Sequence, residues 1–179
     1  PKNKEDDKNW TANRIYAAQT HKFHYMWYNT QHSLQNWVDA SQDHQEWALE
    51  TVTEAFRRDS SMVTFAAHLF IDAWPAGWMK TIMDVDRNPK KGYFAYRDAL
   101  KPTIISIRSD RKHFYEGEDI SIESWIAHDP NTSPSDYYIK YQLEQGGKIV
   151  YSGRSEAEVP DNSSKFQGFI TFTAPKAKS

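Results

Sequence analysis

The pattern of apolar and polar positions changes its character once along the chain, near residue 101. Before that point apolar residues recur at helical spacing or in short continuous runs, and after it they alternate with polar residues. The spacing of three and four residues from Ser33 to Arg58 predicts one long amphipathic helix. Its predicted inner stripe consists of Leu34, Val38, Ser41, Gln45, Ala48, Val52 and Ala55.

A short apolar run, Met62–Ile71, follows this helix. The run does not alternate strictly, which is typical of a strand buried on both faces of a parallel sheet. Asn88–Pro89 then has the pattern of a helix start, an N-cap followed by proline at the first helical position. Pro102 restricts the residue before it, and we place the end of this second helix and a domain boundary at Lys101–Pro102.

The sequence from Thr103 onward predicts about six short strands, because apolar residues alternate with polar ones in segments separated by turn residues. Gly146–Gly147 is the signal of a two-residue hairpin turn. The alternating apolar positions are Ile105, Ile107, Ile120, Ile122, Ile126, Tyr137, Ile139, Tyr141, Leu143, Ile149, Tyr151, Phe166, Ile170 and Phe172, with a break in the pattern at Ser124. The expected fold class is therefore α+β: a helical N-terminal part followed by an immunoglobulin-like antiparallel β-sandwich.

Composition and charge remove several functional classes. The chain has 22 Lys and Arg residues against 24 Asp and Glu residues, a net charge of −2. We therefore expect neither a nucleic acid nor a membrane among its partners, since generic binders of either carry a basic excess. The absence of cysteine removes disulfides, zinc–cysteine sites and thiol catalysis together.

Two groups of polar residues have the residue types of a reactive site. His21 and His24 form an HxxH pair near His32, and this spacing can place two metal ligands on one helix face. No third ligand follows from the spacing, so we interpret the histidines as packing residues and expect no metal and no cofactor. Asp84 and Asp86 are paired carboxylates, a pattern used in acid–base chemistry. Their position directly before Asn88–Pro89 favours a turn role instead.

The segment Asp72–Pro75, with sequence DAWP, is the strongest candidate for chemistry, because it directly follows the predicted strand. Residues just past the carboxyl end of a parallel strand face the ligand crevice in α/β folds. The indole of Trp74 offers a flat apolar surface and the carboxylate of Asp72 accepts hydrogen bonds from hydroxyl groups, so the pair can hold a sugar. The alternative, in which Trp74 packs and Asp72 caps a turn, stays open.

The residues from Phe65 to Pro102 resemble the end of the catalytic barrel of glycoside hydrolase family 2, which includes β-galactosidases, β-mannosidases and β-glucuronidases. That family has a segment like N-D-x-W-P after its last barrel strand, a loop with a second Trp, then V-D, R-x-P-K and a helix with paired aromatic residues. The matching residues are Asp72, Trp74, Pro75, Trp78, Met83–Asp84, Arg87, Pro89–Lys90 and Tyr93–Phe94. The sequence from Ser106 onward resembles the start of the β-sandwich that follows the barrel.

The resemblance implies a division of the chain into two parts. Residues 1–101 would be the C-terminal segment of a (β/α)8 barrel, mainly helical with one buried strand near 62–71. Residues 102–179 would be the immunoglobulin-like β-sandwich. The resemblance implies a retaining mechanism, in which one Glu is the acid/base, a second Glu is the nucleophile, and their carboxyl groups lie about 5–5.5 Å apart. Both lie on earlier barrel strands in the family, so we expect no catalytic residue in this chain.

The resemblance also implies which residues line the sugar site. Asp72 and Trp74 match positions near the rim of that site, and Trp78 matches the second Trp of the motif. His68 stands where the family usually has an aromatic residue, although a histidine can donate a hydrogen bond to a hydroxyl instead. The expected substrate-binding residues are therefore His68, Asp72, Trp74 and Trp78.

The resulting hypothesis is that the chain is the C-terminal part of a retaining β-glycosidase, which hydrolyses β-linked glycosides. It would contribute one wall of the sugar site and a supporting sandwich, and would be inactive alone. Its partners would be a carbohydrate substrate and the upstream remainder of the barrel, in a periplasmic or extracellular location. The alternative is a non-catalytic module that binds carbohydrate or protein through exposed aromatic residues.

Overall fold

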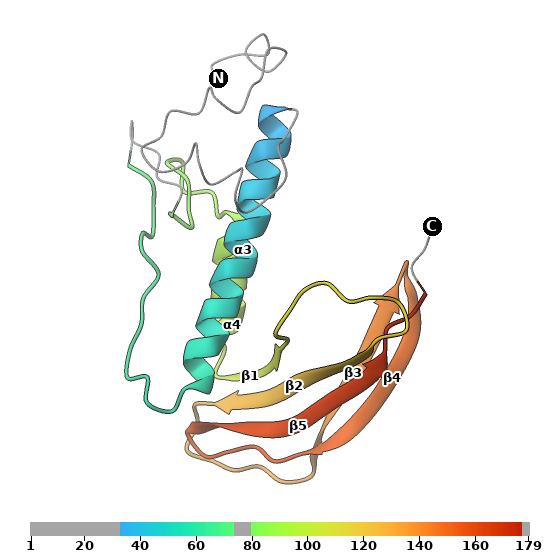
Figure 1. The fold of residues 1–179 in the computed structure, drawn as a ribbon. Coiled ribbons are helices and arrows are strands. Elements are labelled where there is room, and N and C mark those ends of the chain that lie inside the picture. The colour runs from blue at the N-terminus through green and yellow to red at the C-terminus, as the bar shows by residue number, and fades with distance from the viewer. Residues whose placement is uncertain (1–32, 74–79, 177–179) are drawn as a thin grey trace. The chain divides into compact units, whose positions relative to one another are not determined.

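A computed structural model describes residues 33–73 and 80–176 of the chain. Helices come first and antiparallel strands follow, so the predicted α+β class is confirmed (Figure 1). The elements are α3 (Leu34–Arg58), α4 (Lys91–Ala99), β1 (Thr103–Arg108), β2 (Asp119–His128), β3 (Tyr137–Gln145), β4 (Lys148–Ala157) and β5 (Ser163–Thr173).

The internal contacts divide the chain into two units. Of the described residues, the first contains 33–53, 64–73 and 80–100, and the second contains 54–63 and 101–176. Helix α3 therefore contributes residues to both units. The passage from the first unit to the second at Leu100–Lys101 coincides with the change from helical to alternating sequence.

The buried face of α3 in the first unit differs from the predicted stripe. Val52 is 48% exposed, whereas its neighbour Thr53 is only 2% exposed. Helix α4 comes close to α3 at Gly92, where an added Cβ would lie 2.8 Å from Leu49 Cδ1 and 3.0 Å from Gln45 Oε1. This approach places Leu49, which lies outside the predicted stripe, against α4.

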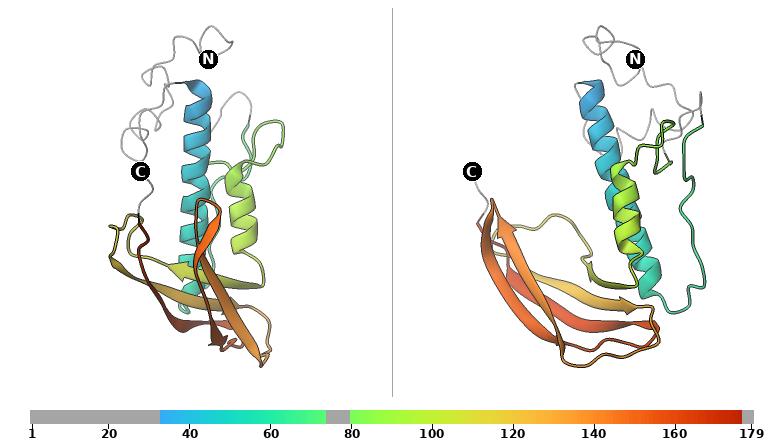
Figure 2. Two further views of the ribbon diagram at one scale, coloured as in Figure 1. Left: turned by 90° about the vertical axis from the view of Figure 1, so that its right-hand side faces the viewer. Right: turned by 180° about the vertical axis from the view of Figure 1, so that it is seen from behind.

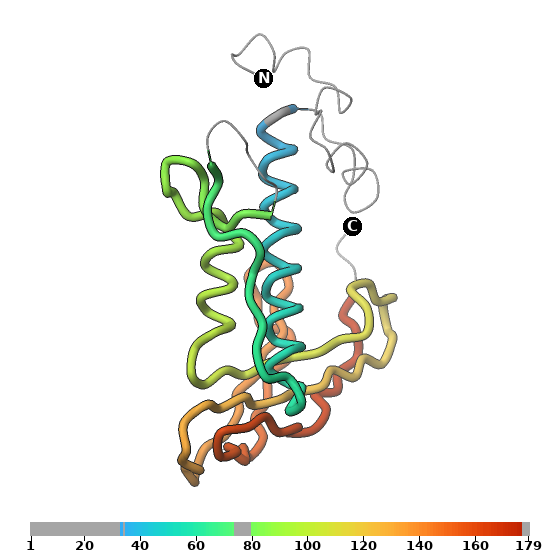
Figure 3. Tube along the Cα trace, turned by 90° about the vertical axis from the view of Figure 1, so that its left-hand side faces the viewer, coloured from blue at the N-terminus to red at the C-terminus, as the bar shows by residue number. Residues whose placement is uncertain are grey.

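The buried strand predicted near 62–71 is not formed. The segment follows an irregular course (Figure 3), and its only bridge within the described residues is a parallel one between Ile71 and Met83. Val63 is 95% exposed and Phe70 is 59% exposed. A strand in the interior of a parallel sheet has a partner strand at each edge and a covering layer on each face, and for this segment the described residues supply only the backbone of Met83 as a partner. That residue donates to the Phe70 carbonyl at 3.0 Å and accepts from the Asp72 amide at 3.1 Å.

The second unit contains two antiparallel sheets, one of three strands in the order β1-β2-β5 and one formed by β3 and β4. The predicted hairpin is confirmed, since Gly146 and Gly147 join β3 to β4 with φ angles of 57° and 75°. Positive φ at both positions is what a tight hairpin turn requires. The predicted break at Ser124 corresponds to a register shift between β2 and β5 next to that residue.

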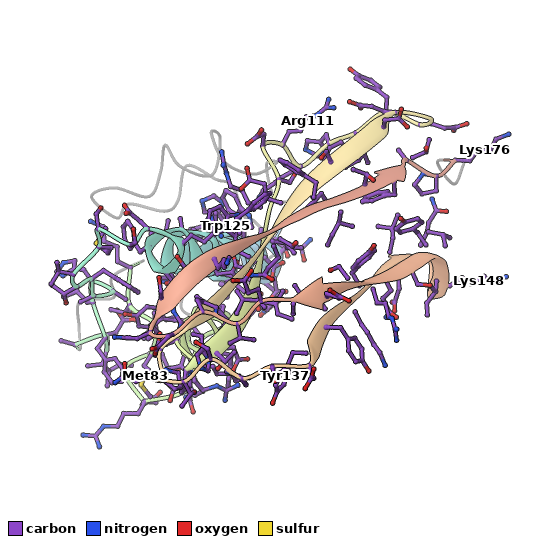
Figure 4. The ribbon with its side chains drawn as sticks, turned by 90° about the horizontal axis from the view of Figure 1, so that it is seen from below. Met83, Arg111, Trp125, Tyr137, Lys148 and Lys176 are labelled. Atoms are coloured by element: carbon purple, nitrogen blue, oxygen red, sulfur yellow. The ribbon has the colours of Figure 1, made fainter. Side chains whose placement is uncertain are left out.

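The two sheets pack against each other through a shared core. Ile126 of β2 and Ile139 of β3 are 4% and 3% exposed and belong to one apolar cluster. The rings of Tyr151 on β4 and Phe172 on β5 also meet, with centroids 5.8 Å apart. Figures 2 and 4 show the sheets as two facing layers. Burial of one face of each sheet explains why the strand sequences alternate.

The end of α3 belongs to the second unit because it is bonded to the three-stranded sheet. Ser106 of β1 is fully buried and donates to the Glu54 carboxylate at 2.6 Å, while Arg58 donates to the Ser106 hydroxyl. Ser164 of β5 donates to the Arg58 carbonyl at 2.8 Å. Burial lowers the pKa of the Arg58 guanidinium, and the nearby Glu54 carboxylate acts in the opposite direction.

Candidate functional site

Two of the four predicted sugar-site residues lie in the described part of the chain. His68 and Asp72 flank the bridge at Ile71, and His68 is exposed. Trp74 and Trp78 lie outside the described residues, as do His21, His24 and His32. The geometry of the candidate site is therefore built around Asp72.

The carboxylate of Asp72 forms an ion pair with Lys90, whose Nζ lies 3.0 Å from Oδ2. Both side chains are largely covered, with exposed fractions of 11% for Asp72 and 17% for Lys90. The backbone fixes the two residues on neighbouring segments, because the Asp72 amide donates to the Met83 carbonyl and the Lys90 amide donates to the Ile82 carbonyl. Asp72 therefore has a defined position at the end of the Ile71–Met83 bridge.

A second buried group completes this arrangement. Lys90 Nζ also donates to Thr81 Oγ1 at 2.5 Å, and Thr81 is fully buried. The carbonyl of Thr81 accepts a hydrogen bond from Gln45 Nε2 on α3 at 2.9 Å. We call Asp72, Lys90, Thr81 and Gln45 the Asp72 network. Polar groups that are largely covered and bond one another in this way hold a defined geometry, because movement of one member breaks the bond to its neighbour.

Sequence reasoning identified Asp72 but missed the other three members of the Asp72 network. Lys90 did stand in the P-K part of the motif, and Gln45 was a polar residue inside an otherwise mainly apolar stripe. Both features were signals of a polar contact in the interior. Neither indicated the partner, since the pairing of residues 18 positions apart depends on the tertiary fold.

The ion pair with Lys90 fixes the orientation of the Asp72 carboxylate. A carboxylate has two oxygens with about four acceptor positions, and the ammonium of Lys90 occupies part of this capacity in Asp72. The ammonium also fixes the direction of the carboxylate, which lowers the entropy lost when a ligand is bound. Asp72 stands two residues before Trp74, the residue that we expect to supply an apolar surface for a sugar ring.

Asp84 has the turn role that the sequence favoured. Its Oδ1 accepts hydrogen bonds from the amides of Asn88 at 2.7 Å and Asp86 at 2.9 Å, and its Oδ2 accepts from Asn88 Nδ2 at 3.0 Å. These hydrogen bonds hold the pKa of the Asp84 carboxyl below its usual range, and the bonds donated by Asn88 have the largest effect. Because Asn88 is used in this turn, it does not cap a helix, and α4 begins later than predicted, at Lys91.

The described residues contain no group of three or more His, Asp or Glu side chains arranged to hold a metal ion. None of the helices within 33–73 and 80–176 combines the length and the apolar character needed to cross a membrane.

The comparisons with known proteins give no family. No family model matches the chain, and no curated protein matches it. The likeness to glycoside hydrolase family 2 therefore depends on the motif residues of the chain itself.

Proposed function

We propose that this chain forms the C-terminal part of a retaining β-glycosidase similar to glycoside hydrolase family 2. The observation that supports the proposal is the ion pair between Asp72 and Lys90, with both side chains less than a fifth exposed. These residues stand in two separate parts of the segment that resembles the family, the D-x-W-P part and the P-K part. The two parts meet in space, as expected if the segment forms one site.

In this proposal the chain binds the sugar but does not break the glycosidic bond. Asp72 accepts hydrogen bonds from sugar hydroxyls, and Trp74 offers its ring face to the apolar side of the sugar. Bond cleavage belongs to two Glu carboxylates on upstream barrel strands, about 5–5.5 Å apart in a retaining enzyme. The two sheets after Lys101 form an immunoglobulin-like sandwich that supports the barrel.

The segment before Asp72 also supports the proposal that upstream barrel strands pack against it. Phe70 and Ile71 are 59% and 38% exposed although both are large and apolar. The bridge from Ile71 to Met83 is parallel, the direction in which barrel strands run. Upstream barrel strands would cover these side chains and would turn the irregular segment into a regular strand.

The test is the kcat/KM for aryl β-glycosides of the native polypeptide that contains these residues, compared with its Asp72→Ala and Trp74→Ala variants. We expect a decrease of roughly 10- to 100-fold for Asp72→Ala, because hydrogen bonds to a charged group contribute about 1.5–3 kcal/mol. Asp86→Ala is the control, since its exposed carboxylate is not part of the Asp72 network. Unchanged kcat/KM in both site variants would contradict the assignment of the sugar site.

A second candidate function, glycan binding without catalysis, is favoured by a different group of side chains. The rings of Trp125 and Phe166 lie 5.3 Å apart and those of Phe166 and Phe169 lie 5.2 Å apart. Phe166 and Phe169 are 39% and 61% exposed, so their rings are accessible for stacking on a sugar. Calorimetric titration with β-linked oligosaccharides tests this function. Heat that disappears in Phe169→Ala would support it, and no heat at millimolar sugar would oppose it.

A further inference from the structure

The β3–β4 sheet has an unpaired edge at β3. Within the described residues β3 pairs only with β4, over Tyr137–Gln145 and Lys148–Ala157. Its other edge therefore presents amide and carbonyl groups that no strand in the described part of the chain uses. Such an edge is a template for a further strand, because main-chain hydrogen bonds give the affinity and alternate side chains give the specificity.

The contacts between the two sheets show where this edge lies. Tyr151 of β4 meets Phe172 of β5, and Ile139 of β3 shares a cluster with Ile126 of β2. Strand β4 therefore faces β5, and β3 faces β2. Because the three-stranded sheet has the order β1-β2-β5, the position next to the free edge of β3 faces β1.

The side of β1 that faces this position is uncovered. Ile105 pairs with Ile126 and Ile107 pairs with Ser124, so both isoleucines lie on the same face of the sheet as Ile126. Ile126 is 4% exposed, but Ile105 and Ile107 are 52% and 60% exposed. The opposite face of β1 is covered, since Ser106 is fully buried against the end of α3. The core between the sheets thus continues onto β1 without a covering layer.

The chain after β5 leads toward the same edge. The Ala174 amide donates to the Glu118 carbonyl at 2.8 Å, and the Ala174 carbonyl accepts from the Gly117 amide at 3.0 Å. Two residues later the Lys176 carbonyl accepts a hydrogen bond from Gln145 Nε2 at 2.8 Å. Lys176 therefore lies at the carboxyl end of β3, where a strand running antiparallel to β3 would begin.

We propose that one further strand of the same protein enters beside Lys176, pairs antiparallel with the free edge of β3 and places alternate apolar side chains on Ile105 and Ile107. The strand would extend the core that Ile126 and Ile139 already form. This proposal is independent of the proposed glycosidase function.

A second copy of the chain fits the free edge of β3 less well than a single strand. Antiparallel pairing of β3 with its own copy needs a two-fold axis perpendicular to the sheet, so both three-stranded sheets would lie on the same side. In each copy β1 lies opposite the position next to the free edge of β3. In such a dimer β1 would therefore occupy the space required by β2 of the other copy. A lone strand without its own covering sheet avoids this overlap.

The experiment compares hydrogen exchange in the native polypeptide from its source with exchange in the chain of residues 1–179, after the intact mass of each is measured. We expect the native mass to exceed 20.9 kDa. We also expect the outward amides of Tyr137–Gln145 to exchange at least about tenfold more slowly in the native polypeptide, because pairing protects them. Amides of β2, which is paired on both sides, serve as the internal reference. A native mass of 20.9 kDa, or equal exchange of β3 in both samples, would overturn the proposal.

A pair of substitutions provides an independent readout. Ile107→Asp should lower the Tm of the native polypeptide by several degrees more than that of the chain 1–179, in which Ile107 is already 60% exposed. Tyr115→Asp is the matched control, since Tyr115 is 82% exposed in a loop, and it should shift both Tm values equally. An equal shift for Ile107→Asp in both proteins would show that nothing covers β1.

Discussion

The ammonium of Lys90 joins the carboxylate of Asp72, 3.0 Å away, to the buried hydroxyl of Thr81. One side chain thus connects the segment after the Ile71–Met83 bridge with the segment before helix α4. Removal of one partner from a covered ion pair leaves the other charge without compensation, which costs more than the pair itself contributes. The Asp72 network should therefore be important for the local fold as well as for any ligand.

Lys90→Met is expected to destabilise the protein by about 2–4 kcal/mol, because the Asp72 carboxylate would stay covered and lose its ammonium. Lys91→Met is the matched control on the next residue, whose ion pair with Asp43 is 45% and 58% exposed, so solvent screens it and its loss should change the stability much less. Urea denaturation of both variants measures the difference. Equal losses of stability would mean that coverage of the Asp72–Lys90 pair has no energetic consequence.

Asp84→Asn is expected to lower the Tm at neutral pH, because Asp84 loses the charge that its amide donors stabilise. The pKa of this carboxyl is lowered in the folded state, so its stabilising contribution is fully present above the unfolded value of about 3.9. This stabilising contribution is lost as the pH falls through the lower pKa that Asp84 has in the folded state. The Tm gap between wild type and Asp84→Asn should therefore narrow below about pH 4, and a gap of constant size would contradict this account.

Gly153→Ala is expected to destabilise the two-stranded sheet by about 1–3 kcal/mol, because an added Cβ overlaps a ring that cannot easily move. The Cβ would lie 2.5–2.6 Å from atoms of the Tyr141 ring, which stacks on Tyr151. Denaturation of Gly153→Ala, Tyr141→Ala and the double variant forms a cycle. The loss caused by Gly153→Ala should be smaller when Tyr141 is already alanine, and strictly additive losses would argue against the overlap.

The strands were predictable because each sheet buries one face, and a buried face imposes alternation directly on the sequence. The turn at Gly146–Gly147 was predictable for a local reason as well, since both residues need positive φ. The break at Ser124 already marked the register shift between β2 and β5. These features depend on residues that are close in sequence or directly paired.

The failed predictions depend on partners that a sequence does not specify. Helix α4 approaches α3 with Gly92 close to Leu49, which no spacing within the helix indicates. The strand near 62–71 would need neighbours on both sides, and the described residues provide only the bridge at Met83. The sequence drew attention to Asp72, but its ion pair with Lys90 comes from tertiary structure.

The most direct test of the proposed function is the hydrolysis of aryl β-galactosides, β-mannosides and β-glucuronides by the native polypeptide, with Asp72→Ala measured beside it. We expect hydrolysis of at least one of these substrates, with kcat/KM lower by about tenfold or more in Asp72→Ala, a change of about 1.4 kcal/mol or more. A folded native polypeptide that hydrolyses none of them, or an Asp72→Ala variant with unchanged kcat/KM, would contradict the proposed function.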